Sequence, residues 1–322
     1  MLAGDERIPQ NMGHIHAMAG SFNLFAGGNL LATSPGYGGR ASRYENTLTI
    51  EGTDQRLHPR HEARITRLEL ADDHTYIAAE AGDCYPPEAG LAKWVRHVAW
   101  MLPDVLVIAD DLVGNGSPAS GKPTVWRMDV DPEANEVTVD GRRFRVSPRS
   151  EQGKAAMVGQ ILLPQTVTVT AEKVRPRGAS WVMCEQVRAT TPDVFGGAGR
   201  GHIVAVLEVL RDASADAGTV GLVEGPGVIG AVVSADDRSR AAVFVTDASE
   251  EAWAVTFTVT GRSELRCLVA GLPPEQVCTV ELGQQAGRDG ETVHTVRVRR
   301  GGETTTSAAG TLIVASAGGS AQ

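Results

Sequence analysis

Short runs of alternating apolar and polar residues dominate the chain. Val137 and Val139 alternate with polar residues, and Val167 and Val169 alternate with threonines. This two-residue period places the apolar side chains on one face of a half-buried β-strand. No stretch has the period of a long amphipathic helix, so we expect a chain built almost entirely from strands.

Most of these runs are rich in β-branched residues and bounded by Gly, Pro, Asp or Asn, which is typical of short strands. Examples of the runs expected to form strands are 21–27, 46–52, 63–71, 93–101, 104–113, 135–141, 142–147, 165–174, 202–210, 227–235, 241–247, 253–261, 294–302 and 310–318. Many short strands at near-regular spacing favour antiparallel sandwiches.

A Gly-rich, polar stretch at 212–227 indicates a boundary between two parts of the chain. We therefore predict an all-β fold. A large antiparallel β-sandwich, of the supersandwich kind, occupies residues 1–225, and a small C-terminal β-domain occupies residues 226–322.

Composition narrows the functional classes. The 322 residues are 42% hydrophobic and 21% charged, enough to bury a sizeable core. The net charge of −9 argues against a general nucleic-acid-binding surface. No window approaches 18 consecutive apolar residues, so we expect no membrane span. The N-terminus lacks the apolar segment of a signal peptide, and the compartment stays open.

The cysteines are widely scattered and form no CxxC pair; they are Cys84, Cys184, Cys267 and Cys278. This spacing favours free thiols over a zinc ribbon or a disulfide scaffold. A bridge between Cys267 and Cys278, on neighbouring strands, remains an alternative.

Two histidines, His14 and His16, stand one residue apart in front of a strand-like run. On a strand they share a face, about 7 Å apart. They could bind one transition metal together, or one could bind metal while the other does acid–base chemistry. The alternative is a pair of hydrogen-bonded or exposed histidines without chemistry.

A locally basic stretch follows in this acidic chain. It contains Arg40, Arg43, Arg56, Arg60, Arg64 and Arg67, with His58 and His61. Guanidinium groups bind carboxylates and sulfates through two parallel hydrogen bonds, so an anionic substrate is the natural inference. A pair of solvated strands with surface ion pairs is the alternative.

Four segments together carry a family resemblance: "HIHAMAGSF", "GGNLLATSPGYG", "ENTLTIEGTDQ" and "WVRHVAWMLPDVLVIADDLVG". Over about residues 12 to 115 the chain resembles the β-sandwich half of heparinase II/III-type polysaccharide lyases. Members of that family join an α/α toroid to a β-sandwich and are often periplasmic or secreted. Nothing resembling the toroid precedes residue 12, so we expect a further segment or a partner subunit to supply it.

The resemblance implies β-elimination on an acidic polysaccharide or oligosaccharide that contains uronic acid. A base removes the C5 proton, the oxygen on C4 leaves, and the site neutralises the neighbouring carboxylate. His14 matches the catalytic histidine of the sandwich. Tyr37 and Tyr44 lie near the motif and are candidates for the base. Arg40, Arg43 and Arg56 are the expected substrate-binding residues.

The resemblance also implies a zinc site. His16 matches one ligand position, and Ser34 and Glu45 stand where the family has an aspartate and a histidine. Met18 replaces a further aspartate of the first motif. Glu45 can bind zinc through oxygen, whereas a serine hydroxyl is a poor ligand. We therefore expect any zinc to sit on His16 and Glu45.

Three hypotheses follow. The chain is the sandwich part of a uronic-acid lyase, a non-catalytic carbohydrate-binding sandwich, or a structural sandwich that supports a partner. His14 and the arginines favour the first two. Met18, Ser34 and Glu45 favour the second over the first, whereas the resemblance favours the lyase.

Overall fold

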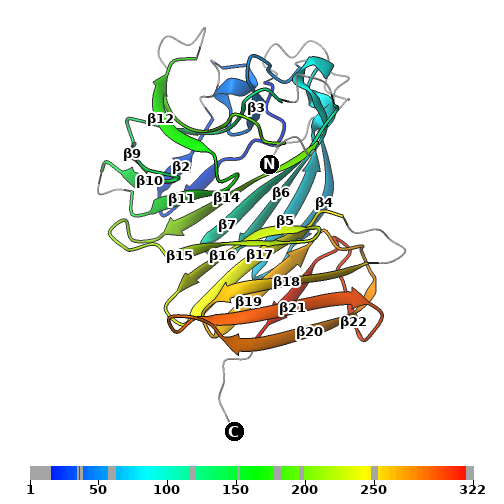
Figure 1. Ribbon diagram of the computed structural model, residues 1–322. Helices are drawn as coiled ribbons and strands as arrows, with labels where there is room; N and C mark the ends of the chain where they lie inside the picture. The colour runs from blue at the N-terminus through cyan, green and yellow to red at the C-terminus, as the bar shows by residue number, and fades with distance from the viewer. Residues whose placement is uncertain are drawn as a thin grey trace. The chain divides into compact units, whose positions relative to one another are not determined.

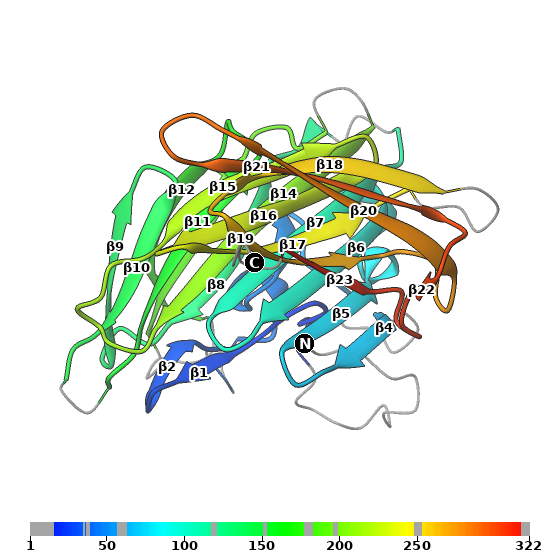
Figure 2. The ribbon, with the colours of Figure 1, turned by 90° about the horizontal axis from the view of Figure 1, so that it is seen from below.

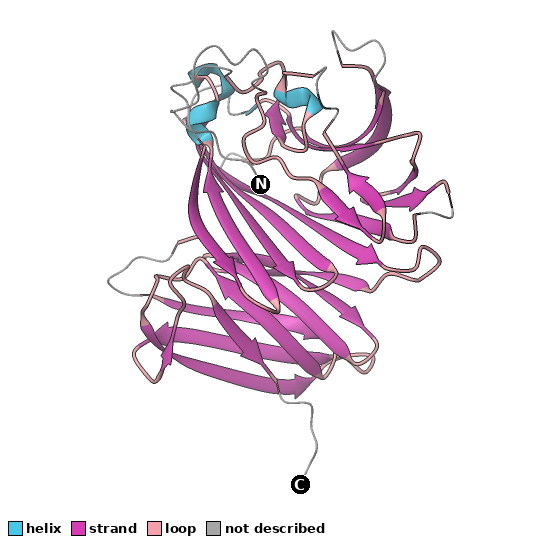
Figure 3. Cartoon of the chain, turned by 180° about the vertical axis from the view of Figure 1, so that it is seen from behind, coloured by secondary structure: helices cyan, strands magenta, loops and turns pink. Residues whose placement is uncertain are grey.

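The chain consists of β-strands with a few single helical turns. The structure, a computed structural model, describes residues 16–34, 36, 39–56, 63–116, 121–150, 153–176, 183–195, 199–247 and 253–316. No α-helix occurs within these ranges, and the helices in Figure 3 are short turns beside the strands. The short 3-10 helices are η2 (Ser42–Tyr44), η3 (Gly82–Cys84) and η4 (Pro87–Ala89). The predicted all-β fold is confirmed.

An eight-stranded sheet has the order β4-β5-β6-β7-β14-β11-β10-β9 (Figure 1). Its strands are β4 (Arg64–Leu70), β5 (His74–Glu80), β6 (Leu91–Met101), β7 (Val105–Gly114), β9 (Asn135–Asp140), β10 (Arg143–Pro148), β11 (Ala156–Leu163) and β14 (Arg200–Leu210). The central strands β7 and β14 are buried along most of their length, because both of their faces are covered.

A four-stranded sheet has the order β12-β13-β8-β3. Its members are β3 (Leu48–Ile50), β8 (Thr124–Val130), β12 (Thr168–Val174) and β13 (Cys184–Thr191). A separate two-stranded ribbon, β1 (Leu24–Ala26) and β2 (Asn29–Ala32), lies near the start of the chain (Figure 2). Every residue of β8 is buried, although Arg127 and Asp129 lie within it.

The chain forms two compact units, each assembled from three stretches. The first comprises 1–66, 78–96 and 110–216, and the second comprises 67–77, 97–109 and 217–322. The second unit holds a five-stranded sheet, β15-β16-β17-β19-β23, and a four-stranded sheet, β18-β21-β20-β22. Their strands are β15 (Thr219–Gly225), β16 (Val228–Ala235), β17 (Arg238–Val245), β18 (Ala254–Gly261), β19 (Glu264–Ala270), β20 (Val277–Ala286), β21 (Thr292–Arg300), β22 (Thr304–Thr305) and β23 (Leu312–Ala315).

Apolar side chains from both of these sheets form the core of the second unit. Phe257, Val296 and Leu265 belong to this core, together with Cys267 and Cys278. Both cysteines are free, as are the other two of the chain. The thiols therefore pack as small apolar groups, in agreement with the expectation of free cysteines.

The predicted boundary at residue 226 falls in a tight turn. Strand β15 pairs with β16 in a continuous antiparallel register from Thr219↔Ser234 to Gly225↔Val228. Gly227 in this turn has a φ of +68°, a conformation that glycine adopts without strain. The division into two folding domains at this point stays a prediction.

A buried ion pair joins the start of the chain to the eight-stranded sheet within the first unit. The guanidinium of Arg96 donates to both carboxylate oxygens of Asp110, at 2.7 and 2.8 Å, and neither side chain is exposed. Its remaining nitrogen donates to the carbonyls of Gly20 and Asn46, at 2.8 and 3.3 Å. The indole of Trp94 donates to Asp110 at 2.7 Å, so the buried charges are satisfied by hydrogen bonds.

We expect Asp110→Ala to lower the free energy of unfolding by about 3–5 kcal/mol, because it leaves the buried Arg96 charge unpaired. Urea unfolding followed by tryptophan fluorescence measures this change. The control is Arg238→Ala: the Arg238 side chain is 75% exposed and pairs with Glu264 at the surface. Its loss costs less than about 1 kcal/mol. Equal effects of the two variants would contradict the structural role of the Arg96–Asp110 pair.

Candidate functional site

The three residues expected to bind metal lie together in the first unit. The Nδ1 atom of His16 is 2.8 Å from Oε1 of Glu45. The hydroxyl of Ser34 also hydrogen-bonds to the Glu45 carboxylate. Glu45 is fully buried and His16 is 11% exposed, so the pair lies just beneath the surface. The second oxygen of Glu45, Oε2, is buried without a hydrogen-bond partner among the described residues.

Side chains, not strand ladders, hold the His16 segment in place. The amide of Gln55 accepts from the Ala19 backbone N–H at 2.9 Å and donates to the Ala19 carbonyl at 3.1 Å. Thr47 donates to the same carbonyl, and Asn46 donates to the Phe22 carbonyl, both at 2.6 Å. These contacts satisfy backbone groups that would otherwise be buried without partners. The residues after Glu45 therefore fix the position of the segment that carries His16.

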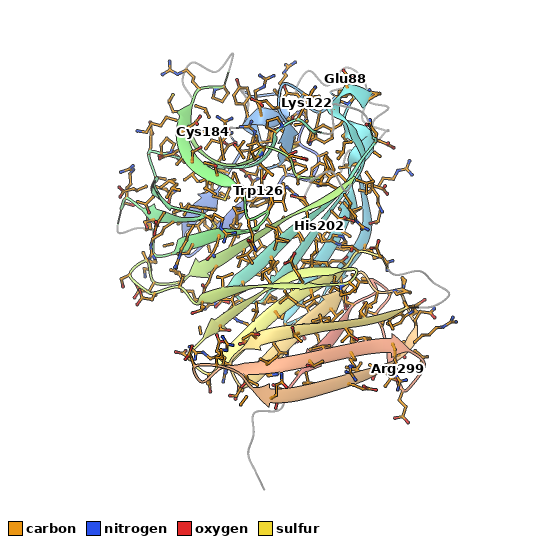
Figure 4. The ribbon with its side chains drawn as sticks, in the orientation of Figure 1. Glu88, Lys122, Trp126, Cys184, His202 and Arg299 are labelled. Carbon is orange, nitrogen blue, oxygen red and sulfur yellow. The ribbon has the colours of Figure 1, made fainter. Side chains whose placement is uncertain are left out.

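A buried polar layer formed by Arg127, Asp129 and Gln186 adjoins Glu45. Strands β8 and β13 pair so that Asp129 faces Gln186, whose amide donates to Oδ1 of Asp129 at 2.9 Å. Arg127 donates to the side-chain oxygen of Gln186, and to Thr49 at 2.8 Å. Figure 4 labels Trp126 and Cys184 on the same two strands. Sequence reasoning missed this layer, although polar residues at i and i+2 within the apolar run 124–130 are a signal for it.

Burial decides the protonation of this layer. It raises the pKa of Asp129 to about 7, an effect that the neighbouring Glu45 charge strengthens and that Gln186 and Arg127 oppose. Burial also raises the pKa of Glu45, against the effect of its hydrogen bonds to His16 and Ser34. It lowers the pKa of Arg127 to about 10. The layer can therefore hold a proton near neutral pH.

Among the predicted substrate-binding arginines, Arg43 has a guanidinium that already binds a carboxylate. Arg43 is 57% exposed and binds Asp54 through Nε, at 3.0 Å, and through Nη2. The carbonyl of Arg40 accepts from the Ala17 backbone N–H, and the backbone N–H of Arg56 donates to Cys84. The structure thus assigns a guanidinium partner to Arg43 and places Arg40 beside the His16 segment. A role in substrate binding stays a prediction for all three.

The candidate catalytic residues are only partly described. Tyr44 ends η2, directly before Glu45, and is half-buried. His14 and Tyr37 lie outside the described residues. His16 itself lies in an irregular segment and not in a strand, so the expected strand does not extend to it. Whether His14 faces the same side stays a prediction.

Zinc requires three or four nitrogen, sulfur or carboxylate donors around one point. His16 and Glu45 offer two such donors, and the unpartnered Oε2 of Glu45 is a suitable ligand atom. Within the described ranges, however, no group of three or more His, Cys, Asp or Glu could hold a metal ion. These donors do not complete a zinc site by themselves.

Another buried carboxylate, Asp111, binds Arg200 and lies beside His202, both of them partly exposed on β14. Arg200 donates to both of its oxygens, at 2.8 and 2.9 Å, and Nε2 of His202 lies 3.2 Å from Oδ1. Burial alone would raise the pKa of Asp111, but hydrogen bonds from His202 and Arg200 hold it well below its usual range. Figure 4 labels His202. This cluster lies outside the predicted site residues, and its carboxylate orients the Arg200 side chain.

Comparison with known proteins identifies the family. The sequence model described as "Heparinase II/III-like, C-terminal" matches residues 2–200, more than half of the chain. The chain therefore belongs to the heparinase II/III-like family through this C-terminal domain. A comparison with curated proteins finds no significant match.

Solved structures with the same fold include a heparan sulfate lyase and a heparinase III. The heparan sulfate lyase HepC from Pedobacter heparinus is similar with a TM-score of 0.58 and 13% identity, over 73% of this chain and 38% of that protein. A heparinase III gives a TM-score of 0.58 and 13% identity, over 73% of this chain and 37% of that protein. The chain thus spans less than half of either relative. Within the described residues, no helix is long and apolar enough to cross a membrane.

We expect the stability of the chain to fall as the pH rises from about 4 to about 7, partly through Asp129. Its folded-state pKa of about 7 exceeds the ordinary value near 4, so the folded state binds the proton more tightly. This contribution is fully present below about pH 4 and lost as pH rises through 7, and it amounts to at most about 4 kcal/mol.

Asp129→Asn should flatten this part of the profile. Urea unfolding of both proteins between about pH 4 and pH 8 measures the difference. A matched control is Asp212→Asn, which alters an exposed carboxylate bound to Ser214. A profile for Asp129→Asn that parallels the unmodified protein would show that Asp129 is ionised throughout.

Proposed function

We propose that this chain is the β-sandwich part of a polysaccharide lyase that acts by β-elimination on a polysaccharide containing uronic acid. The family membership supports the class of enzyme. The observation that supports a particular site is the His16–Glu45 pair at 2.8 Å, because the two residues come from two segments of the family motif. A helical toroid, on a further segment or a partner subunit, completes the substrate cleft.

The reaction needs a base, a proton donor for the leaving oxygen, and neutralisation of the uronate carboxylate. We assign acid–base chemistry to His14, which precedes His16 on the chain. Tyr44, next to the buried Glu45, and Tyr37 are the candidates for the base if the sandwich supplies it. Arg40, Arg43 and Arg56 are the candidates for the carboxylate, and Arg43 would exchange Asp54 for substrate.

A non-catalytic carbohydrate-binding sandwich is the second candidate function. It is favoured by the pairing of Arg43 with Asp54, which neutralises an expected substrate-binding cation. It is also favoured by Ser34, Glu45 and Met18, which depart from the residues typical of the family. The formation of a 4,5-unsaturated uronate, which absorbs in the near ultraviolet, distinguishes the two candidates.

We expect the chain alone to be nearly inactive on uronic-acid polymers, and the enzyme completed with its toroid to release unsaturated product. In the completed enzyme His14→Ala should lower kcat by about 100-fold or more, the scale of a lost acid–base group. Single-turnover absorbance measures this rate. Fast turnover by the chain alone would shift the base to Tyr37 or Tyr44, and an unchanged rate in His14→Ala would exclude His14.

His16→Ala should instead lower the melting temperature, because it removes the hydrogen-bond partner of a fully buried carboxylate, a loss of about 1–3 kcal/mol. Any zinc that copurifies with the chain should also be lost in this variant. Thermal melts and elemental analysis of the unmodified protein and His16→Ala test both statements. Full metal content in His16→Ala would remove His16 from the ligands, and an unchanged melt would contradict its structural role.

A further inference from the structure

The four-stranded sheet of the second unit has one face packed on the core and one face exposed. Along β18, burial alternates strictly: Val255, Phe257 and Val259 are buried, and the residues between them are exposed. The register of β18, β21 and β20 carries this alternation across the sheet. We call the exposed side the arginine–threonine face; its residues are Ala254, Thr256, Thr258, Thr260, Thr279, Glu281, Gly283, Gln285, Val293, Thr295, Arg297 and Arg299.

Two arginines on this face share one carboxylate. Arg297 and Arg299 lie two residues apart on β21, so their side chains point the same way. They are 61% and 63% exposed, and the nearest atoms of Glu281 lie 3.9 and 3.2 Å from them. Figure 4 labels Arg299 on β21. The face therefore has an excess positive charge on a chain whose net charge is −9.

These ion pairs can be exchanged. Glu281 is itself 47% exposed, and solvent-exposed ion pairs contribute little to stability. A guanidinium that gives up Glu281 can bind another carboxylate or a sulfate through two parallel hydrogen bonds. The arginines are thus positioned to accept an anionic group from solution.

The row of residues next to Arg297 and Glu281 has small side chains. It consists of Thr258, Thr295 and Gly283, paired across the three strands. A Cβ atom on Gly283 would meet only Thr295 atoms, at 3.9 and 4.0 Å, so ordinary van der Waals space lies above this glycine. Threonine hydroxyls both donate and accept hydrogen bonds, as sugar hydroxyls do. The face carries no aromatic side chain, so stacking on a neutral sugar ring is not its mode of binding.

We propose that the arginine–threonine face binds an acidic polysaccharide, with Arg297 and Arg299 on its carboxylate or sulfate groups and the threonine row on its hydroxyls. The choice of polymer rests on the proposed function, and the face gives the chain a second contact with the same class of substrate. A single-stranded nucleic acid is the less favoured polyanion, because the face carries no aromatic side chain on which a base could stack.

Binding of the full chain to heparan sulfate and to alginate, with dextran as the neutral polymer, tests the proposal by affinity electrophoresis. Arg297→Ala/Arg299→Ala should weaken binding to the acidic polymers by about tenfold or more, and Glu281→Gln should strengthen it. Binding should weaken with added salt, because exposed charges are screened. Dextran should not bind.

The matched control is Arg238→Ala/Arg288→Ala, which removes the same charge from exposed positions of the second unit outside this face. Thermal melts establish that all variants fold. An equal loss of binding in both double variants would reduce the effect to overall charge and overturn the proposal. Competition by single-stranded DNA as strong as that by alginate would overturn the choice of polysaccharide.

The unsaturated-product assay separates this proposal from the proposed function. Specific loss of binding in Arg297→Ala/Arg299→Ala, with no elimination by the completed enzyme, would retain the face and reject the lyase. Elimination together with unchanged binding in that variant would retain the lyase and reject the face.

Discussion

The geometry of the candidate site depends on one buried guanidinium. Arg96 uses one edge to bind Asp110 and its remaining nitrogen to hold the carbonyls of Gly20 and Asn46. One carbonyl follows His16 by a few residues, and the other belongs to the residue after Glu45. A single side chain on β6 therefore sets both halves of the His16–Glu45 contact against the sheet.

The close approach at this point also restricts the backbone. Gly20 has a φ of +73°, and a Cβ atom there would lie 2.8 Å from the Trp94 ring. Any larger residue would both strain the turn and push it away from the ring whose indole binds Asp110. The glycine, the tryptophan and the ion pair therefore form one unit of packing, and substitution of any of them disturbs the others.

The sequence predicts individual strands better than it predicts the contacts between distant residues. The alternation in 253–261 correctly predicts β18, and the family motif correctly groups His16, Ser34 and Glu45. Strands β8 and β11 lie outside the runs named from the sequence, since they are buried along nearly all of their length and show no simple alternation. The contact of Asp129 with Gln186 joins residues 57 positions apart, and only the pairing of β8 with β13 creates it.

Glu45 belongs to the family motif and also adjoins the Asp129 contact that strand pairing creates. Glu45 puts a carboxylate at a motif position where the family resemblance implies a histidine, and burial makes its charge costly. His16 offsets that cost through its hydrogen bond, and the raised pKa of Asp129 removes a second charge from the same buried region. The charge of this region is therefore balanced by the hydrogen bond from His16 to Glu45 and by the proton on Asp129, which adjoins Glu45. Because protons are exchanged with solvent, this balance changes with pH as Asp129 titrates.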